Sequence, residues 1–327
     1  MGTVADTIFR GQLLDRRQKL GAALAEFKDQ HLIHLLHEVD AALERMDQGS
    51  YGLCEVCREP IETERLMADP LVCACLDHLS SDELRALERD LDLASRIQRT
   101  LLPKQHLRFD GWEVCYHYEP ASLVSGDYCD VVQPENGGGD FFFFLGDVSG
   151  KGVAASMLMA HLHAIFRSLL AVGLPVNQLV EQANRIFCES TMSAQYATVV
   201  CGRAGRAGEI EISNAGHCPP LLVRGGEVTS LEATGLPIGL FCNGPYSVKK
   251  VQLAPGDNLL LYTDGLSEAQ NRFKAEYGAG RLTRLLGDRH THPPQALINA
   301  CLEDLAVFRS GAPKTDDLTI MVIRRVG

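Results

Sequence analysis

The sequence has no long apolar run. No stretch of eighteen or more consecutive apolar residues occurs among its 327 residues, and a helix that crosses a membrane needs about that many. The first residues, Met-Gly-Thr-Val-Ala-Asp, contain no basic segment followed by an apolar one, which is the pattern of a secretory signal. We therefore expect no membrane span, and a cytoplasmic location.

Positive charge is also scarce. The chain has 31 Lys and Arg residues against 42 Asp and Glu residues, a net charge of -11, which opposes broad electrostatic binding to nucleic acid or to anionic lipid. We therefore expect neither nucleic acid nor membrane as a partner. Because 46% of the residues are hydrophobic, the chain can bury a large core and still contain a smaller second module.

Proline is absent between residues 5 and 48. Over this range apolar residues from Phe9 to Met46 recur at spacings of three, four, seven or eight, as on one face of a helix. The pattern predicts a single long amphipathic helix over residues 1–48. Its apolar stripe must be covered by another helix, so we expect a homodimer through the N-terminal helices.

The cysteines are not distributed as in a disulfide framework. Of eleven, four lie between positions 54 and 75, and the others are scattered singly in apolar sequence, which fits an intracellular metal site and buried thiols. Cys54 and Cys57 form a Cys-x2-Cys pair, and after seventeen residues Cys75 and His78 form a Cys-x2-His pair. Four such ligands fit one tetrahedral structural Zn²⁺. Cys73 is an alternative ligand, which leaves open whether Cys73 or His78 completes the site.

Residues 49–79 contain Tyr51-Gly-Leu-Cys-Glu-Val-Cys-Arg-Glu-Pro-Ile, Arg65-Leu-Met-Ala-Asp-Pro and Cys75. These segments resemble the DksA/TraR-type zinc finger over residues 35–79, with His78 where that family usually has a fourth cysteine. Members of the family insert a helical hairpin with an acidic tip into RNA polymerase. A continuous helix over residues 1–48 has no such hairpin, so we do not transfer that activity.

The apolar period changes along the rest of the chain. A second amphipathic helix is predicted over residues 80–103, where apolar residues recur at three or four. From Gly111 the period is two, which predicts strands at 112–118, 128–132, 197–203, 210–213, 221–223, 248–253, 258–263 and 318–324. Helices are expected at 153–172, 176–190 and 294–309. Strands joined by short turns, with helices packed outside, predict an α+β domain of antiparallel sheets over residues 104–327.

The segment from Asp140 to Gly152 is the centre of this domain. Its four phenylalanines and Leu145 form an apolar run that is too short for a membrane and predicts a central strand covered on both faces. Asp147 follows at the end of the strand, and the glycines at 146, 150 and 152 allow a sharp turn into the next helix. Taken alone, a carboxylate there suits metal or phosphate chemistry as well as it suits a plain acidic turn.

Carboxylates recur at the edges of four predicted strands, at Asp127, Asp147, Asp264 and Asp316. If these strands converge, the like charges repel one another and are stable together only with cations between them. Hard oxygen ligands select Mg²⁺ or Mn²⁺ over Zn²⁺. Two such ions could activate a bridging water and neutralise a phosphate ester during in-line attack. These four residues are therefore the predicted catalytic residues.

A set of motifs follows in order along residues 93–326. They are Leu93-Ala-Ser-Arg-Ile-Gln-Arg-Thr-Leu-Leu-Pro, Ser125-Gly-Asp-Tyr, Gly146-Asp-Val-Ser-Gly-Lys-Gly, Asn214-Ala-Gly-His, Gly235-Leu-Pro-Ile-Gly-Leu, Tyr262-Thr-Asp-Gly-Leu-Ser-Glu-Ala and Asp316-Asp-Leu-Thr. As an ordered set they closely resemble the PPM metal-dependent serine/threonine phosphatases of the bacterial SpoIIE/RsbU type.

The resemblance implies an αββα sandwich, preceded here by a helical zinc-finger module. It also implies the ligands of two Mn²⁺ or Mg²⁺ ions: Asp147 as the bridge, the backbone carbonyl of Val148, then Asp127, Asp264 and Asp316, with Asp317 and Asp130 as second candidates. The substrate implied is phosphoserine or phosphothreonine on an anti-sigma-factor antagonist. In the family, the helix before the core, here residues 90–102, links a sensor module to the active site and often mediates dimerisation. Regulation through the N-terminal module is therefore expected.

Three other functions are weighed against this one. The segment from His217 and Cys218 to Arg224 has the spacing of a cysteine-dependent phosphatase. However, Pro219 and Pro220 remove two backbone N–H donors that such a loop aims at phosphate, so we interpret Cys218 as a loop or buried thiol. The others are a zinc-finger transcription regulator that binds RNA polymerase and a catalytically silent phosphatase-like scaffold. All the predicted ligands are present, which favours the enzyme.

Overall fold

The computed structural model describes residues 4–26, 29–79, 81–134, 139–192 and 194–327. The chain divides into two compact units, Met1–Arg89 and Asp90–Gly327. Each unit has its own hydrophobic clusters. They are called unit 1 and unit 2 below.

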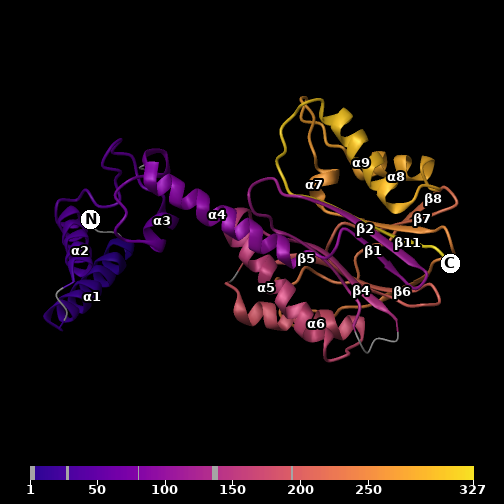
Figure 1. The fold of residues 1–327 in the computed structure, drawn as a ribbon, viewed down its shortest axis with the longest axis horizontal. Coiled ribbons are helices and arrows are strands. Elements are labelled where there is room, and N and C mark those ends of the chain that lie inside the picture. The colour runs from indigo at the N-terminus through magenta and orange to yellow at the C-terminus, as the bar shows by residue number, and fades with distance from the viewer. Residues whose placement is uncertain (1–3, 27–28, 80, 135–138, 193) are drawn as a thin grey trace. The chain divides into compact units, whose positions relative to one another are not determined.

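Unit 2 contains two antiparallel sheets (Figure 1). One has six strands in the order β1-β2-β11-β10-β7-β8, and the other has five in the order β3-β4-β5-β6-β9. The strands are β1 (His106–Phe109), β2 (Trp112–Glu119), β3 (Asp127–Val132), β4 (Phe141–Val148), β5 (Ala197–Ala204), β6 (Glu209–Ala215), β7 (Leu221–Arg224), β8 (Glu227–Ser230), β9 (Lys249–Gln252), β10 (Asn258–Tyr262) and β11 (Leu318–Arg325). All eight predicted strands are present. The sequence pattern did not predict β1 and β8, which have four residues each and are too short to show a period.

Helices cover the outer face of each sheet. α5 (Gly152–Leu170) and α6 (Val176–Ser190) pack on the five-stranded sheet, and α8 (Ala279–Asp288) and α9 (Pro294–Arg309) pack on the six-stranded one. The layers are helix, sheet, sheet, helix, which confirms the predicted α+β sandwich. By length and composition alone α5 could cross a membrane, but its residues Leu162 and Phe166 are fully buried in the cluster beneath it.

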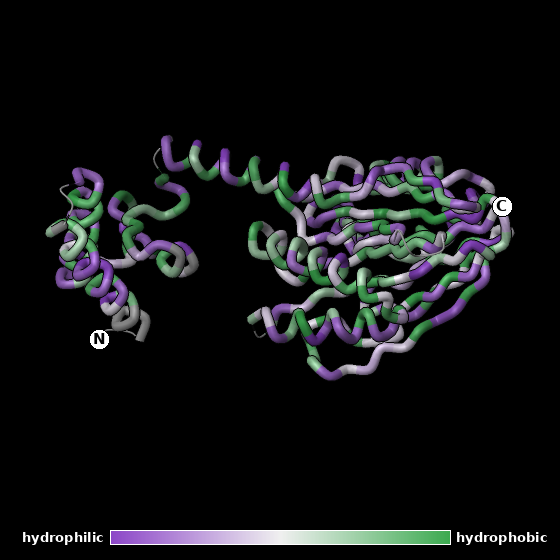
Figure 2. The backbone as a smooth tube through the Cα atoms, turned by 60° about the horizontal axis from the view of Figure 1, so that its bottom comes forward, coloured by the Kyte–Doolittle hydropathy of each residue, from purple (hydrophilic) through white to green (hydrophobic). Residues whose placement is uncertain are grey.

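The main core lies between the two sheets, and β4 shows how it forms. Phe141, Phe143 and Leu145 belong to the cluster between the sheets, whereas Phe144 belongs to the cluster under α5 and α6, as the pleat of a strand requires. β4 pairs with β3 on one side and with β5 on the other. The prediction of a central strand covered on both faces is therefore confirmed. Figure 2 shows the apolar stretches along these strands.

Unit 1 contradicts the prediction of one helix over residues 1–48. The chain forms α1 (Val4–Glu26) and α2 (Gln30–Asp47). The two helices lie antiparallel, as the ion pairs from Arg10 to Asp47 and from Arg17 to Asp40 show. The side chain of Asp29 accepts a hydrogen bond from a backbone N–H of the first turn and so caps α2. The apolar stripe is covered within the hairpin, by the cluster of Leu13, Val39, Ala42 and Leu43.

The remaining elements of unit 1 are short, except for the last. After the hairpin come α3 (Thr63–Ala68), a 3-10 helix η1 (Leu76–His78) and α4 (Ser81–Leu101). α4 corresponds to the helix predicted over residues 80–103, of which residue 80 lies outside the described residues, and it runs from unit 1 into unit 2. Figure 2 shows hydrophobic and hydrophilic segments alternating along it.

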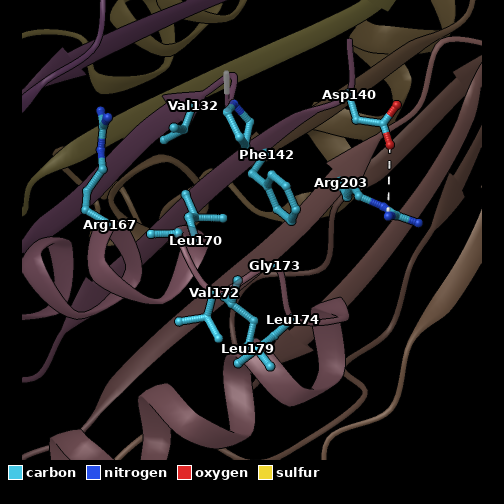
Figure 3. A pocket seen from close by; sticks show the side chains of 12 residues that line it. Val132, Asp140, Phe142, Arg167, Leu170, Val172, Gly173, Leu174, Leu179 and Arg203 are labelled. Atoms are coloured by element: carbon cyan, nitrogen blue, oxygen red, sulfur yellow. Dashed lines mark ion pairs between the residues drawn. The ribbon is translucent and has the colours of Figure 1, made fainter. Parts of the chain in front are cut away.

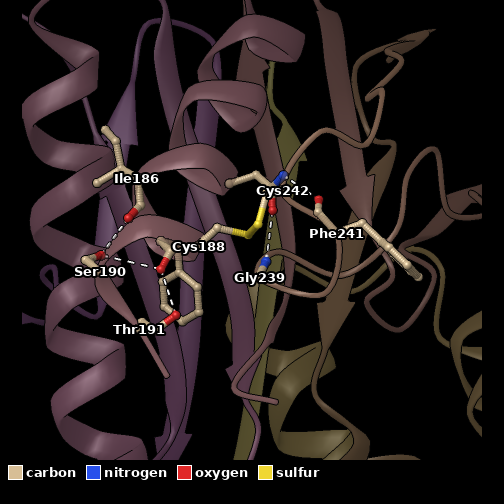
Figure 4. Close-up of a disulfide and its surroundings, with 9 residues drawn as sticks. Ile186, Cys188, Ser190, Thr191, Gly239, Phe241 and Cys242 are labelled. Carbon is tan, nitrogen blue, oxygen red and sulfur yellow. Dashed lines mark hydrogen bonds between the residues drawn. A yellow bond between two sulfur atoms is a disulfide. The ribbon is translucent and has the colours of Figure 1, made fainter. Parts of the chain in front are cut away.

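One disulfide departs from the expected cysteine chemistry. Cys188, in the last turn of α6, is bonded to Cys242, 54 residues later in the sequence (Figure 4). The same loop is held a second time by Asn184, whose side chain accepts from the N–H of Gly239 and donates to the carbonyl of Phe241. The other nine cysteines are free, in agreement with the prediction of thiols rather than a disulfide framework.

Candidate active site and metal sites

The four carboxylates predicted to be catalytic come together at one edge of the sandwich. Asp127 begins β3, Asp147 lies next to the end of β4, and the two are direct cross-strand partners. Asp264 begins the short helix α7 (Asp264–Ser267) directly after β10. Asp316 precedes β11. Their charges interact, because Asp264 and Asp316 both contribute to the pKa of Asp147.

Two glycines allow this convergence. A Cβ atom on Gly265 would lie 1.9 Å from the backbone oxygen of Asp317, so only glycine lets α7 approach the segment that leads into β11. A Cβ atom on Gly126 would lie 3.1 Å from the carbonyl oxygen of Val148 and 3.4 Å from Oδ1 of Asp147. The carbonyl predicted as a metal ligand therefore lies on the same side as the carboxylates.

Asp127 is the most deeply buried of the four, with 1% of its surface exposed. Its Oδ2 accepts hydrogen bonds from the hydroxyl of Thr263, at 3.0 Å, and from that of Thr319. Both threonines belong to the six-stranded sheet side, so Asp127 connects the two sheets. Burial, with a further contribution from Asp147, raises the pKa of Asp127 well above its usual range.

The pKa values of Asp147 and Asp264 are also raised, so the ionised forms of these two side chains are disfavoured. Burial raises the pKa of Asp147 to about 7, and the nearby carboxylates of Asp264 and Asp316 add to the effect. Burial, followed by Asp316, raises the pKa of Asp264. Buried oxygen donors with unrelieved negative charge are the donor set that divalent hard cations prefer. The residues present therefore fit Mn²⁺ or Mg²⁺.

The two second candidates have different positions. Asp317 lies beside the four carboxylates, but its Oδ1 and Oδ2 accept from the backbone N–H groups of Ala121, at 2.7 Å, and Gly126, at 2.9 Å. It braces the loop that leads into β3. Asp130 lies apart from the cluster, where it receives two hydrogen bonds from Arg167 of α5, at 2.6 and 2.8 Å. The structure thus removes Asp130 from the candidate ligands.

Sequence reasoning assigned no role to His217, although it lies in the Asn-Ala-Gly-His motif. It is 5% exposed, and its Nδ1 lies 2.8 Å from Oγ1 of Thr198, which is the cross-strand partner of Asp147. Asn214 closes the turn by hydrogen bonds to the N–H and the carbonyl of His217. Burial lowers the pKa of His217 to about 4, so it is neutral at pH 7 and supports the strand behind Asp147.

The cysteine-dependent alternative is not supported. Burial raises the pKa of Cys218 to about 12, whereas a nucleophilic cysteine needs a lowered pKa. Arg224 is part of β7 and pairs with Asp257 at 2.8 Å. Cys218 is therefore a poorly ionisable thiol, in agreement with our interpretation.

A second metal-ligand cluster lies in unit 1. One donor atom from each of Cys54, Cys57, Cys75 and His78 lies within 4.8 Å of the others. The Sγ atom of Cys75 is 3.8 Å from that of Cys57 and 3.2 Å from Nδ1 of His78. Three sulfur donors and one imidazole are a tetrahedral zinc set. Cys73 is not a member of this group, so the structure favours His78 over Cys73 as the fourth ligand.

A cavity of about 540 Å³ lies in unit 2, beside β3, β4 and the turn between α5 and α6 (Figure 3). Its lining is mostly apolar and includes the charged residues Asp140, Arg167 and Arg203. Arg167 is neutralised by Asp130, and Arg203 by Glu211 at 3.0 Å. None of the predicted site residues lines this cavity, so the candidate active site is the carboxylate edge.

Known proteins are similar to this chain in sequence or in fold. Protein IcfG of Synechocystis sp. is 24% identical over 72% of this chain and 41% of its own length. The phosphoserine phosphatase RsbU of Bacillus subtilis is 23% identical over 73% of this chain and 71% of its own length.

Among solved structures, the SiaA-PP2C domain of Pseudomonas aeruginosa matches 75% of this chain and 99% of that domain, with a TM-score of 0.64 and 23% identity. Unit 2 therefore has the PP2C-type fold, as the motifs implied. Residues 137–326 match the family described as stage II sporulation protein E (SpoIIE). Because this match covers more than half of the chain, the protein belongs to the SpoIIE family.

Proposed function

We propose that this protein is a metal-dependent protein-serine/threonine phosphatase. Its substrate would be phosphoserine or phosphothreonine on a regulatory protein of the anti-sigma-factor-antagonist class. The observation that carries the proposal is the meeting of Asp127, Asp147, Asp264 and Asp316, from four separate segments, at one edge of a PP2C-type sandwich. Family membership and the similarity to a phosphoserine phosphatase support the substrate class.

The chain's own residues would prepare the site for two Mn²⁺ or Mg²⁺ ions. Asp147, Asp264, Asp316, Asp127 and the carbonyl of Val148 would hold them, since their oxygens are hard donors whose mutual repulsion a cation relieves. When bound, such ions supply an activated water and neutralise charge on the phosphate. The threonine hydroxyls on Asp127 keep its carboxylate in one orientation, which fixes the donor position before any ligand arrives.

The test is manganese-dependent release of phosphate from phosphorylated antagonist proteins of the same genome. We expect no release without Mn²⁺, and a loss of roughly 10³-fold or more in kcat/KM in Asp147→Ala and Asp264→Ala variants. Asp110→Ala, at an exposed position, is the matched control and should keep full activity. Circular dichroism checks the fold of each variant. Activity that survives in both site variants refutes the two-metal mechanism, and an inactive wild-type protein that still binds Mn²⁺ identifies a silent scaffold.

For unit 1 we propose one structural Zn²⁺ bound by Cys54, Cys57, Cys75 and His78, and a regulatory role. The close grouping of their donor atoms supports the zinc site. The homodimer was expected because the apolar stripe of residues 1–48 needed a partner helix. The hairpin covers this stripe itself, so the stripe no longer argues for a dimer. α4 offers another surface, since Leu93 and Ile97, one turn apart, are 51% and 57% exposed. We assign the proposed dimer contact to α4.

The hairpin also supports a second candidate function. A continuous helix had argued against the RNA polymerase activity of DksA/TraR-type proteins, but α1 and α2 form a hairpin in the same unit as the candidate zinc site. Unit 1 is therefore a candidate ligand of RNA polymerase. Binding of purified core polymerase to the full chain, measured by interferometry and reduced in an Asp29→Ala variant, would support this function. No binding at micromolar concentration would exclude it.

A further inference from the structure

Lys151 is a cation in direct contact with a predicted metal ligand. Its Nζ lies 2.8 Å from Oδ2 of Asp316 and 2.7 Å from the carbonyl oxygen of Thr315. Its charge also reaches Asp147 and Asp264, where it partly offsets the repulsion among the carboxylates. Lys151 is thus a counter-ion of the acidic cluster.

The backbone around Lys151 is built to place it there. Lys151 precedes the first turn of α5, between Gly150 and Gly152, whose φ angles are +97° and +73°. A Cβ atom at either glycine would meet nothing within 4 Å, so these glycines serve the left-handed turn and not a close approach. The side chain is 65% exposed. It is therefore held at its tip only and can reorient.

Asp316 cannot hold Lys151 and a divalent cation in the same way. Its Oδ2 accepts from Lys151 and its Oδ1 accepts from the backbone N–H of Asp317 at 3.1 Å, so a metal ion would share an oxygen with one of these donors, and the two cations repel each other. A phosphoserine substrate brings nearly two negative charges and three acceptor oxygens to the same edge. An ammonium group on a flexible stem is well suited to such a ligand.

We propose that Lys151 exchanges partners: it neutralises Asp316 while the site is free of metal, and it binds the substrate phosphate once metal ions occupy the carboxylates. This inference rests on the proposed phosphatase function. It makes Lys151 both a competitor of the metal ions and a substrate-binding residue. A purely structural ion pair would have only the first property.

The test compares Lys151→Met with the wild-type protein in two measurements. Titration calorimetry without substrate should show Mn²⁺ binding about three- to tenfold tighter in the variant, because Asp316 is no longer occupied. Binding of inorganic phosphate to the Mn²⁺-loaded protein should become about tenfold weaker, and KM for the phosphorylated substrate should rise by about the same factor. Lys151→Arg should restore most of the phosphate binding.

Lys250→Met is the matched control, since Lys250 forms an ion pair with Glu211 at 2.7 Å on the surface of the same unit. It should leave both binding constants unchanged. If Lys151→Met binds inorganic phosphate as tightly as the wild-type protein, the inference is wrong even where the wild-type protein is an active phosphatase. If no phosphoprotein is hydrolysed, the proposed function fails. The comparison of phosphate binding still shows whether Lys151 binds phosphate.

Discussion

At the scale of single residues, ionisation of the grouped carboxylates costs free energy, which a bound cation would offset. Burial and the neighbouring Asp264 and Asp316 raise the pKa of Asp147 to about 7, against 3.8 for an ordinary aspartate. Between these two pH values the folded metal-free protein binds a proton that the unfolded chain does not. Its stability therefore falls as the pH rises through this window.

Replacing Asp147 by Asn should therefore stabilise the metal-free protein at high pH. At pH 8 we expect the free energy of unfolding of Asp147→Asn to exceed that of the wild-type protein by on the order of 2 kcal/mol, because no charge has to be buried. At pH 2.5, where Asp147 is almost fully protonated in both states, the difference should disappear. Urea denaturation in the presence of a chelator measures both values. Equal stability at pH 8 would contradict the raised pKa.

The same comparison with Mn²⁺ present separates electrostatics from packing. A metal ion that binds only the folded state stabilises it by mass action, so Mn²⁺ should stabilise the wild-type protein more than Asp147→Asn. The variant should also lack phosphatase activity. A variant that gains as much from Mn²⁺ as the wild-type protein would place Asp147 outside the metal site.

Motifs were sufficient to predict that the carboxylates lie close together, but not which residues form hydrogen bonds to them. Asp127 and Asp130 are three residues apart on β3, so the pleat alone places them on opposite faces, and sequence reasoning could have excluded Asp130. The hydroxyls on Asp127 come from Thr263 and Thr319, whose approach depends on how two sheets stack. The contact between His217 and Thr198 depends on the pairing of β5 with β6 within one sheet. Such contacts leave no local pattern in the sequence.

At the scale of secondary structure elements, long periodic segments were predictable and one boundary was not. β4 carries an apolar run, and its position between two other strands follows from that run. The break between α1 and α2 contains no proline or glycine, and apolar spacing continues on both sides of it. Asp29 is the local signal, since its side chain caps α2. A single acidic residue in a long amphipathic pattern is too weak to separate a hairpin from a straight helix.

The disulfide between Cys188 and Cys242 is an element-scale feature with a measurable effect. It closes a loop of 54 residues, and a crosslink over such a loop restricts the unfolded chain. We expect the oxidised protein to be more stable than the reduced protein by roughly 2–4 kcal/mol. Urea denaturation with and without dithiothreitol measures the difference, and a non-reducing peptide map identifies the bond.

Cys242→Ser serves as the control for this comparison. Its stability should not respond to dithiothreitol, and it should match the reduced wild-type protein. Because Ile238, in the same loop, pairs with Ala197 beside Thr198, the reduced protein should also show faster hydrogen exchange at Ala197. If the free energy of unfolding of the wild-type protein is the same with and without dithiothreitol, the two thiols remain free in solution.

At the scale of the whole molecule, the chain consists of two compact units with separate hydrophobic clusters. The clusters of unit 1 are formed around the candidate zinc ligands and the hairpin. Those of unit 2 are formed by the sheets and the helices that cover them. Loss of zinc should therefore unfold unit 1 without unfolding unit 2.

Cys54→Ser tests this independence, because Cys54 is fully buried at the centre of its cluster. The variant should lose its zinc and the helical signal of unit 1, and its oligomeric state or turnover should change, as a regulatory role requires. Its affinity for Mn²⁺ should stay within roughly twofold of the wild-type value, because the carboxylate edge belongs to the other unit. Zinc content, circular dichroism, light scattering, a phosphatase assay and Mn²⁺ calorimetry measure these properties. Cys73→Ser is the matched control and should retain zinc, since Cys73 is outside the ligand group. Zinc loss in Cys73→Ser, or loss of Mn²⁺ binding in Cys54→Ser, would contradict the assignment of one metal site to each unit.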